Sequence, residues 1–264
     1  MNVMTLDIET TGLDYMHDDI IEVAIHGDIG TADIYIQSDV DSAPEALERH
    51  HLTKEFLADH KKYDTRKSAL EVVASIISDP ESHVVAHNAK FVFTMLMCNM
   101  IREDVGSDLL DAMSNVVPLD TMVMDVMLNP NARGRSRSLQ SLCKLYGTNI
   151  RPNGSAKRDA KCIAEIADAQ IGLLVSDNEN VSDADIDSLS KLVAKRAEEQ
   201  QFDRNLWLEA HGRDEEPTGY PYLLFPTRPE GRGTHNHQTG GGDTSMSCPW
   251  SSDMRTLRFP QVDI

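Results

Sequence analysis

Cysteine is scarce in this sequence and widely scattered. The 264 residues include four cysteines, with no CxxC pair among them: Cys98, Cys143, Cys162 and Cys248. Because zinc sites need clustered ligands and disulfide-rich domains need closely spaced pairs, this spacing argues against both. The first three cysteines lie in apolar helical surroundings, which suit reduced thiols in a protein core.

Long apolar runs are absent as well. No uninterrupted apolar stretch reaches the length that a membrane span requires, and the first residues lead into a strand pattern without a basic leader region. We therefore expect a cytoplasmic protein with no membrane partner. At this length the chain can bury one substantial core, with room for a small extension.

Positive charge is in the minority. The sequence has 25 Lys and Arg against 43 Asp and Glu, which gives a formal net charge of -18. This imbalance argues against broad electrostatic adhesion to a phosphate backbone, although a nuclease needs clustered carboxylates and can keep a local basic rim. The segment from Ala132 to Ser138 (ARGRSRS) supplies three arginines within five positions and is either a solvated loop or a phosphate contact.

Apolar periodicity predicts three strands first and then helices that alternate with strands. Val3–Asp7, Asp18–Gly27 and ADIYIQS alternate like the strands of an antiparallel meander. Helices are predicted from Pro44 and from the cap signal at Thr53. The remaining predicted elements are a helix over Ser68–Ser78, a short buried strand at HVVAHNA, a helix over Phe91–Arg102, a strand over Val116–Thr121, and helices over Ser138–Gly147 and Asp159–Ala169. This order predicts an α/β domain with a mixed sheet.

The composition changes after about Leu174. An acidic, polar linker (SDNENVSDADID) is followed by a long amphipathic helix over about Ala184–Ala210 and by an apolar cluster at Tyr220–Pro226, which we expect to dock on the main domain. Prolines and glycines without periodicity mark the remainder. We predict three parts: a main domain over 1–174, a linker, long helix and docking segment over 175–229, and a mostly irregular tail over 230–264.

Two carboxylates lie on the first predicted strand, in the motif DIETTGL. Asp7 and Glu9 are two positions apart, so both side chains project from the same face and can converge on one cation. Burying two uncompensated carboxylates is costly, and a divalent metal held by oxygen ligands is the natural partner. The turn that follows, Thr10 to Gly12, can bring backbone amides close to a nucleotide, and Leu13 offers an apolar surface to a base.

A series of motifs in the first 169 residues resembles the DnaQ-like (DEDD) 3'-5' exonucleases. DIETTGL, DDIIEVA and HHLTKEFL are similar to the first part of that family, HNAKF to its second motif, PLDTMVM to the strand that follows, and SLQSLCKLYG with SAKRDAKCIAEI to the helices of its third motif. The resemblance implies that residues 1–174 form a DnaQ-like exonuclease domain. The implied fold is ribonuclease H-like, a mixed five-stranded sheet flanked by helices, here with a C-terminal helical extension and an irregular tail.

The resemblance also implies an activity and a set of site residues. The family hydrolyses nucleotides from 3' ends and holds two Mg²⁺ or Mn²⁺ ions with four carboxylates, three of which would be Asp7, Glu9 and Asp159, as catalytic residues and metal ligands. The implied partners are single-stranded 3' ends, DNA in preference to RNA, and a polymerase or another replication protein. The expected substrate-binding residues are Thr10, Thr11, Gly12, Leu13, His87, Asn88 and Phe91, with His87 and Asn88 bracing the site.

Two positions depart from the histidine subtype of this family. The fourth carboxylate falls at Val92, and the general base falls at Gly154, while Ser155 stands where another subtype has tyrosine. One ion would still be held well, but the second would be weak, so we predict an impaired exonuclease. The alternatives are a catalytically inactive module that binds nucleic acid 3' ends or a replication or repair partner, and a mutated copy of an active enzyme.

Three further candidates carry weaker signals. Asp120 and Asp125 lie near the predicted end of the sheet and could substitute for the lost carboxylate, although neither is at the motif position. Trp207, on the long helix, is expected to pack rather than to stack on a base.

Overall fold

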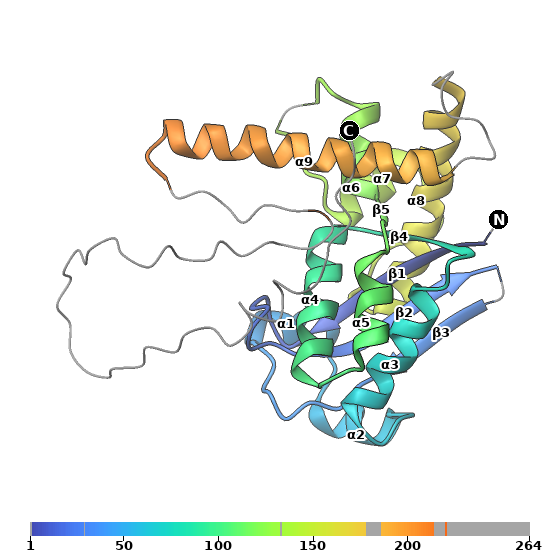
Figure 1. The fold of residues 1–264 in the computed structure, drawn as a ribbon, viewed down its shortest axis with the longest axis vertical. Coiled ribbons are helices and arrows are strands. Elements are labelled where there is room, and N and C mark those ends of the chain that lie inside the picture. The colour runs from blue at the N-terminus through green and yellow to red at the C-terminus, as the bar shows by residue number, and fades with distance from the viewer. Residues whose placement is uncertain (1, 29, 133, 178–185, 214–219, 221–264) are drawn as a thin grey trace.

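A five-stranded mixed sheet organises the structure, which is a computed structural model that describes residues 2–28, 30–132, 134–177, 186–213 and 220 (Figure 1). The strand order is β3-β2-β1-β4-β5. The first three strands form an antiparallel meander, β4 pairs with β1 in parallel, and β5 pairs with β4 in parallel. Their bounds are β1 Asn2–Thr10, β2 Ile20–Gly27, β3 Gly30–Tyr35, β4 Ser82–Ala86 and β5 Leu119–Asp120.

Helices cover both faces of this sheet. Figure 1 shows α3, α4 and α5 on one side and α8 on the other, while α9 passes the β5 edge. The bounds are α1 Pro44–His50, α2 Lys54–His60, α3 Arg66–Ile77, α4 Ala89–Arg102, α5 Ser107–Ser114, α6 Thr121–Leu128, α7 Leu139–Tyr146, α8 Ala156–Asp177 and α9 Ile186–Ala210. This arrangement confirms the predicted α/β class with a mixed sheet flanked by helices.

The two faces of β1 differ in chemistry, because successive side chains of a strand point in opposite directions. The residues of one face join α3 and α4 in the largest apolar core: Met4, Leu6 and Ile8. The residues of the other face are polar and lie on the α8 side: Thr5, Asp7 and Glu9. Thr5 is the clearest marker of this side, since its Oγ1 donates to the backbone oxygen of Ala160 in α8 at 2.7 Å.

Small side chains let α8 approach the sheet closely. Ala24, which lies opposite Asp7 in the β1–β2 register, forms a buried cluster with Ala156 and Ala160 of α8. Because these three residues end at Cβ, the helix backbone can lie directly on the strands. The first turn of α8 therefore reaches the polar face of β1.

Some element boundaries differ from the predicted ones. The strand predicted over Val116–Thr121 is reduced to Leu119–Asp120, because the Asp120 side chain accepts a hydrogen bond from the Met122 backbone and caps α6. Helix α5 was not predicted. Helix α8 begins three residues before Asp159 and continues to Asp177, so the boundary predicted at residue 174 falls inside a continuous helix.

The prediction for Trp207 is wrong. This side chain is 44% exposed, and its ring stacks on His211 with the centroids 4.1 Å apart. The apolar face of α9 instead buries residues such as Leu189 and Val193. Trp207 therefore lies on the outer surface of the helix.

The region after α9 is described only at Tyr220. Its hydroxyl donates to the backbone oxygen of Pro118 at 2.9 Å, and its ring packs on the largest core. The rest of the predicted docking segment, the tail over 230–264 and Cys248 lie outside the described residues, as do the linker residues 178–185.

Two expectations drawn from composition can be compared with the described part of the chain. Cys98, Cys143 and Cys162 are buried and form no disulfide, as predicted. No helix of residues 2–28, 30–132, 134–177 and 186–213 combines the length and the hydropathy of a membrane span.

The close contact between α8 and the sheet predicts the effect of a larger side chain. Ala160→Leu should lower the free energy of unfolding by about 1–3 kcal/mol, because the added atoms have no space between α8 and the strands. Asp168→Leu, at an exposed position of the same helix, should change it by less than about 0.5 kcal/mol. Urea unfolding of both variants tests this, and equal losses would contradict the packing.

Candidate metal centre and active site

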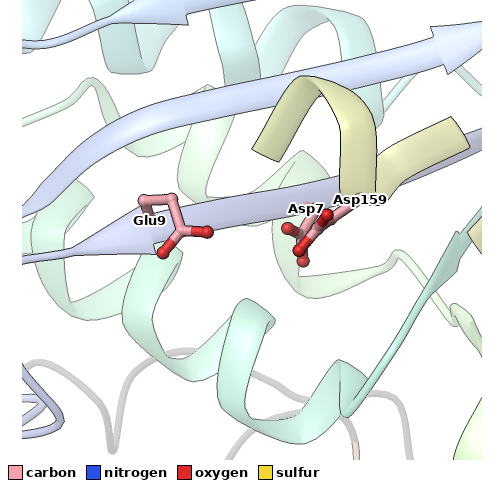
Figure 2. A group of neighbouring side chains, drawn as sticks. All are labelled: Asp7, Glu9 and Asp159. Carbon is pink, nitrogen blue, oxygen red and sulfur yellow. The ribbon is translucent and has the colours of Figure 1, made fainter. Parts of the chain in front are cut away.

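Three carboxylates from two distant segments meet on the polar face of the sheet (Figure 2). Asp7 and Glu9 project from β1, and Asp159 from the first turn of α8. Each offers a carboxylate oxygen, and these oxygens all lie within 4.8 Å of one another. The structure thus brings together the three residues that the sequence singled out.

The position of Asp159 depends on how the first turn of α8 is held. The Glu22 carboxylate accepts hydrogen bonds from the Lys157 backbone and the Ser155 hydroxyl, both at 3.3 Å. Asp159 itself accepts from the Asn153 backbone at 3.0 Å. A carboxylate at a helix N-terminus satisfies free N–H groups and complements the helix dipole, so Glu22 fixes α8 relative to the strands.

Sequence reasoning did not identify Glu22 as a site residue. It lies on β2, directly opposite Glu9, and is buried. Residues directly opposite in adjacent strands project from the same face, so a fourth carboxylate lies beside the cluster. The available signal was an acidic residue within the otherwise apolar stretch IIEVAI, residues 20–25.

The cluster concentrates negative charge in a poorly solvated place. Burial raises the pKa of Asp7 well above its usual range, and the neighbouring Glu9 and Asp159 raise it further. Burial also raises the pKa of Glu9 to about 8, against a partial lowering by Arg49. The pKa of Asp159 is raised, again mainly by burial. Without added positive charge, burial therefore disfavours the ionised form of each of the three groups.

The donor set fits a hard divalent cation. All three groups supply carboxylate oxygens, the ligands that Mg²⁺ and Mn²⁺ prefer. Oε2 of Glu9 is buried and has no hydrogen-bond partner, and the nearest Arg49 nitrogen lies 3.6 Å from it. A buried oxygen left unpaired is costly, and a cation between the three groups would satisfy it.

Residues 4–167 match the sequence model of a known family, RNase_T, described as exonuclease. The chain belongs to this exonuclease family. The match covers more than half of the chain and includes all three carboxylates. It confirms the resemblance to DnaQ-like, DEDD-type exonucleases with a ribonuclease H-like fold.

Solved structures with a similar fold include complexes of exonuclease I. E. coli exonuclease I with a dT13 oligonucleotide matches with a TM-score of 0.54 and 16% identity, over 66% of this chain and 41% of that one. The same enzyme with dA16 matches with 0.54 and 14%, over 68% and 44%. A complex of ExoI with SSB-Ct matches with 0.53 and 14%, over 66% and 42%. This chain therefore corresponds to less than half of each of those proteins. No curated protein sequence matches it.

The two departures from the family pattern are built into the structure. Val92 is 2% exposed and packs in the largest apolar core with Phe93, so no oxygen replaces the fourth carboxylate there. Gly154 has φ +77°, and a Cβ at this position would lie 2.2 Å from the backbone oxygen of Arg49. A histidine therefore has no room at position 154 in this conformation.

Asp120 and Asp125 are not available as substitute ligands. Asp120 accepts hydrogen bonds from the backbone of Asn88 and Ala89 and thereby holds the start of α4. Asp125 is fully buried and paired with Arg135 and Arg137. Both carboxylates already have partners in the fold.

These contacts also explain the basic segment. Arg135 and Arg137 both bind Asp125, with Arg137 Nε at 2.8 Å, and Tyr146 donates to the same carboxylate at 2.9 Å. The arginines therefore serve an internal ion pair, while Arg133 lies outside the described residues.

His87 and Asn88 lie between β4 and α4. Nδ1 of His87 lies 2.8 Å from the Thr121 hydroxyl, and burial lowers the pKa of His87 to about 4. This imidazole is neutral at physiological pH and is a weak base. Asn88 caps α4 with φ +59° and has an exposed side chain. Phe91, one turn further, is half-buried and lies 5.7 Å from the Tyr15 ring.

The turn after β1 is held by its own side chains. The hydroxyl of Thr10 donates to the Gly12 backbone at 2.6 Å, and that of Thr11 to Asp18 at 2.9 Å. The Asp18 carboxylate lies where a Cβ of Gly12 would be. The two hydroxyls are therefore engaged internally, whereas Leu13 is 71% exposed and can contact a base.

The raised pKa of Glu9 predicts a link between pH, metal and stability. A carboxyl with pKa about 8 when folded and 4.5 ordinarily stabilises the fold below pH 4.5 and loses this contribution as the pH rises to about 8. Without metal, the melting temperature should fall between pH 6 and pH 8. Mn²⁺ should raise it more at pH 8, because metal binds the ionised form.

Thermal melts at both pH values, with and without Mn²⁺, test this. Glu9→Gln is the control, since it removes one of the carboxyls whose pKa burial raises and should reduce the difference between the two pH values. Equal Mn²⁺ shifts at pH 6 and pH 8 in the unaltered chain would contradict the prediction.

The backbone at Gly154 predicts a second result. Gly154→Ala should destabilise the fold by about 1–3 kcal/mol or more, because a side chain at this φ is strained and its Cβ meets Arg49. Gly172→Ala, at an exposed helical glycine with nothing near its Cβ, should instead stabilise by up to about 1 kcal/mol. Denaturant unfolding measures the stability of both variants. An unchanged free energy of unfolding in Gly154→Ala would show that the loop can adapt to a side chain.

Proposed function

We propose that this chain is a slow 3'-5' exonuclease that acts on single-stranded DNA. The observation that carries the proposal is the convergence of Asp7, Glu9 and Asp159 in a chain of the exonuclease family. These three residues would be its catalytic residues and metal ligands. Mg²⁺ or Mn²⁺ would be the cofactor, since the donors are all carboxylate oxygens.

A bound divalent ion would supply Lewis acidity at the scissile phosphate and favour ionisation of an attacking water. The chain's part is to hold the ligands in place. Glu22 orients the first turn of α8, so Asp159 stays opposite Asp7. On the α4 side, Val92 gives no oxygen, and a second ion would keep only a share of Asp7 and the substrate phosphate.

The absence of a general base and of the fourth carboxylate determines the rate of hydrolysis that we expect. Loss of a positioned general base costs about 10²- to 10⁴-fold, and Gly154 leaves no base at the family's position. His87, with its pKa near 4 and its bond to Thr121, is a poor replacement. We therefore infer that hydrolysis is slow and that the second metal site is the weaker one.

The structural relatives support DNA as the substrate. Exonuclease I has been solved with dT13 and with dA16, and ExoI with SSB-Ct. We propose that the exposed Leu13 contacts the terminal base, with the turn Thr10–Gly12 beneath it and with Asn88 and Phe91 beside the strand. His87 would brace this side of the site. A replication protein such as a polymerase is the proposed protein partner, and the cytoplasm the proposed location.

A second candidate is a catalytically inactive module that binds 3' ends. It is favoured by Val92, whose side chain is part of the apolar core, and by Gly154, whose position excludes a larger residue. Such a module would keep the carboxylate cluster for metal-assisted binding without turnover.

A nuclease assay separates the two. With Mn²⁺ and a 5'-labelled single strand, the chain should release nucleotides slowly from the 3' end, and Asp7→Ala should abolish this. Binding of the strand without any shortening would support the inactive module and sink the exonuclease proposal.

Restoring the fourth carboxylate gives a second comparison within the same assay. Val92→Asp should raise the Mn²⁺-dependent rate by roughly tenfold or more by strengthening the second ion. Val92→Asn is the matched control, because asparagine has nearly the same shape as aspartate but carries no charge. Equal rates for the two variants would show that the lost ligand does not limit turnover.

A further inference from the structure

Arg49 is a cation at the edge of the carboxylate cluster that sequence reasoning passed over. It lies in the last turn of α1, and its Nη2 lies 3.6 Å from Oε2 of Glu9. Its side chain remains 59% exposed. Among the residues that the structure describes, Glu9 is its one ion-pair partner, and no hydrogen bond from its guanidinium is found.

The backbone of Arg49 is fixed relative to the site. Ala43, just before α1, donates its N–H to the Thr11 backbone at the end of β1 at 2.7 Å. The Arg49 carbonyl packs against Gly154, in the loop that leads to Asp159. Helix α1 is thus anchored to both segments that supply the carboxylates, and the guanidinium extends from a defined place.

The pair with Glu9 does not account for Arg49 as a structural residue. At 3.6 Å, with a half-exposed arginine and no hydrogen bond, such an ion pair contributes little to stability. A guanidinium has five N–H donors in a planar fork that suits phosphate. These donors remain available to a ligand that enters the cluster from solvent.

The balance of charge between the carboxylates and the cations of the site suggests a role for the Arg49 guanidinium. Two divalent ions match four ionised carboxylate ligands, but with Val92 at the fourth position three ligands remain, because Glu22 is engaged by the first turn of α8. One divalent ion and one guanidinium together match the charge of these three. Burial raises the pKa of Asp159 and Arg49 offsets part of this rise, so the guanidinium lies within electrostatic reach of both Glu9 and Asp159.

Building on the proposed function, we propose that Arg49 binds the phosphate of the 3'-terminal nucleotide on the Glu9 and Asp159 side of the cluster and adds positive charge to a site that holds one divalent ion well. The site would then combine one well-held divalent ion with one arginine. Arg49 is a substrate-binding residue in this arrangement, and its contact is with the phosphate and not with the base or the sugar.

The contact can be measured without turnover. Calorimetry in Ca²⁺ would compare thymidine 5'-monophosphate with thymidine, since the ratio of their affinities isolates the phosphate. Arg49→Met should reduce this ratio by roughly tenfold or more and leave thymidine binding unchanged. The affinity ratio of Arg49→Lys should lie between those of the unaltered chain and Arg49→Met, because lysine keeps the positive charge but lacks the planar fork of donors.

Arg196→Met is the matched control, since Arg196 is a partly exposed arginine with one carboxylate partner on α9. An unchanged ratio in Arg49→Met, or equal losses in Arg49→Met and Arg196→Met, would overturn the inference. Thermal melts establish that the variants are folded. If Arg49→Met does not fold, Arg49→Lys still tests the inference, because it too should reduce the ratio. If the unaltered chain prefers the monophosphate through Arg49 yet never shortens DNA, the proposed hydrolysis fails and the phosphate contact stands.

Discussion

The structure depends on the cost of placing several carboxylates on one poorly solvated face of a sheet. Burial raises the pKa of Asp7, Glu9 and Asp159, and Asp159 raises that of Asp7 and Glu9 further. Arg49, the arginine paired with Glu9, is half-exposed and not hydrogen-bonded to it. Such a cluster lowers stability unless a cation accompanies it. Its presence in the exonuclease family makes a divalent ion the natural companion, and the architecture around it serves to hold three oxygens within range of one another.

Two physical features produce that geometry. Alternation along β1 separates the large apolar side chains from the polar ones, so a single strand contributes both to the core and to the site. Three alanines then let α8 lie close to the polar face, and Glu22 holds its first turn. The same packing surrounds the two positions where the family has a general base and a fourth carboxylate. The Arg49 backbone encloses Gly154, and the apolar core encloses Val92.

The sequence was informative where a local pattern determines the structure. Strand alternation predicted the meander and the shared face of Asp7 and Glu9, and the cap signals predicted the starts of α1 and α2 and the end of α7 at Gly147. The family motifs supplied Asp159, which no local pattern connects to β1.

What the sequence could not supply were contacts between distant segments. Glu22 and Arg49 look like ordinary surface-type residues until the β1–β2 register and the packing of α1 bring them to the cluster. The sequence left Arg135 and Arg137 open between a solvated loop and a phosphate contact, because their partner, Asp125, lies in a different element. Trp207 was expected to pack, but the narrow apolar stripe of α9 leaves it outside.

The central claim is that these three carboxylates form one good site for a divalent ion. Anomalous diffraction from crystals soaked in Mn²⁺ tests it most directly. The account predicts one strong peak between Asp7, Glu9 and Asp159, with a weak peak or none at the second position roughly 4 Å away. An empty cluster, or two peaks of equal strength, would contradict it.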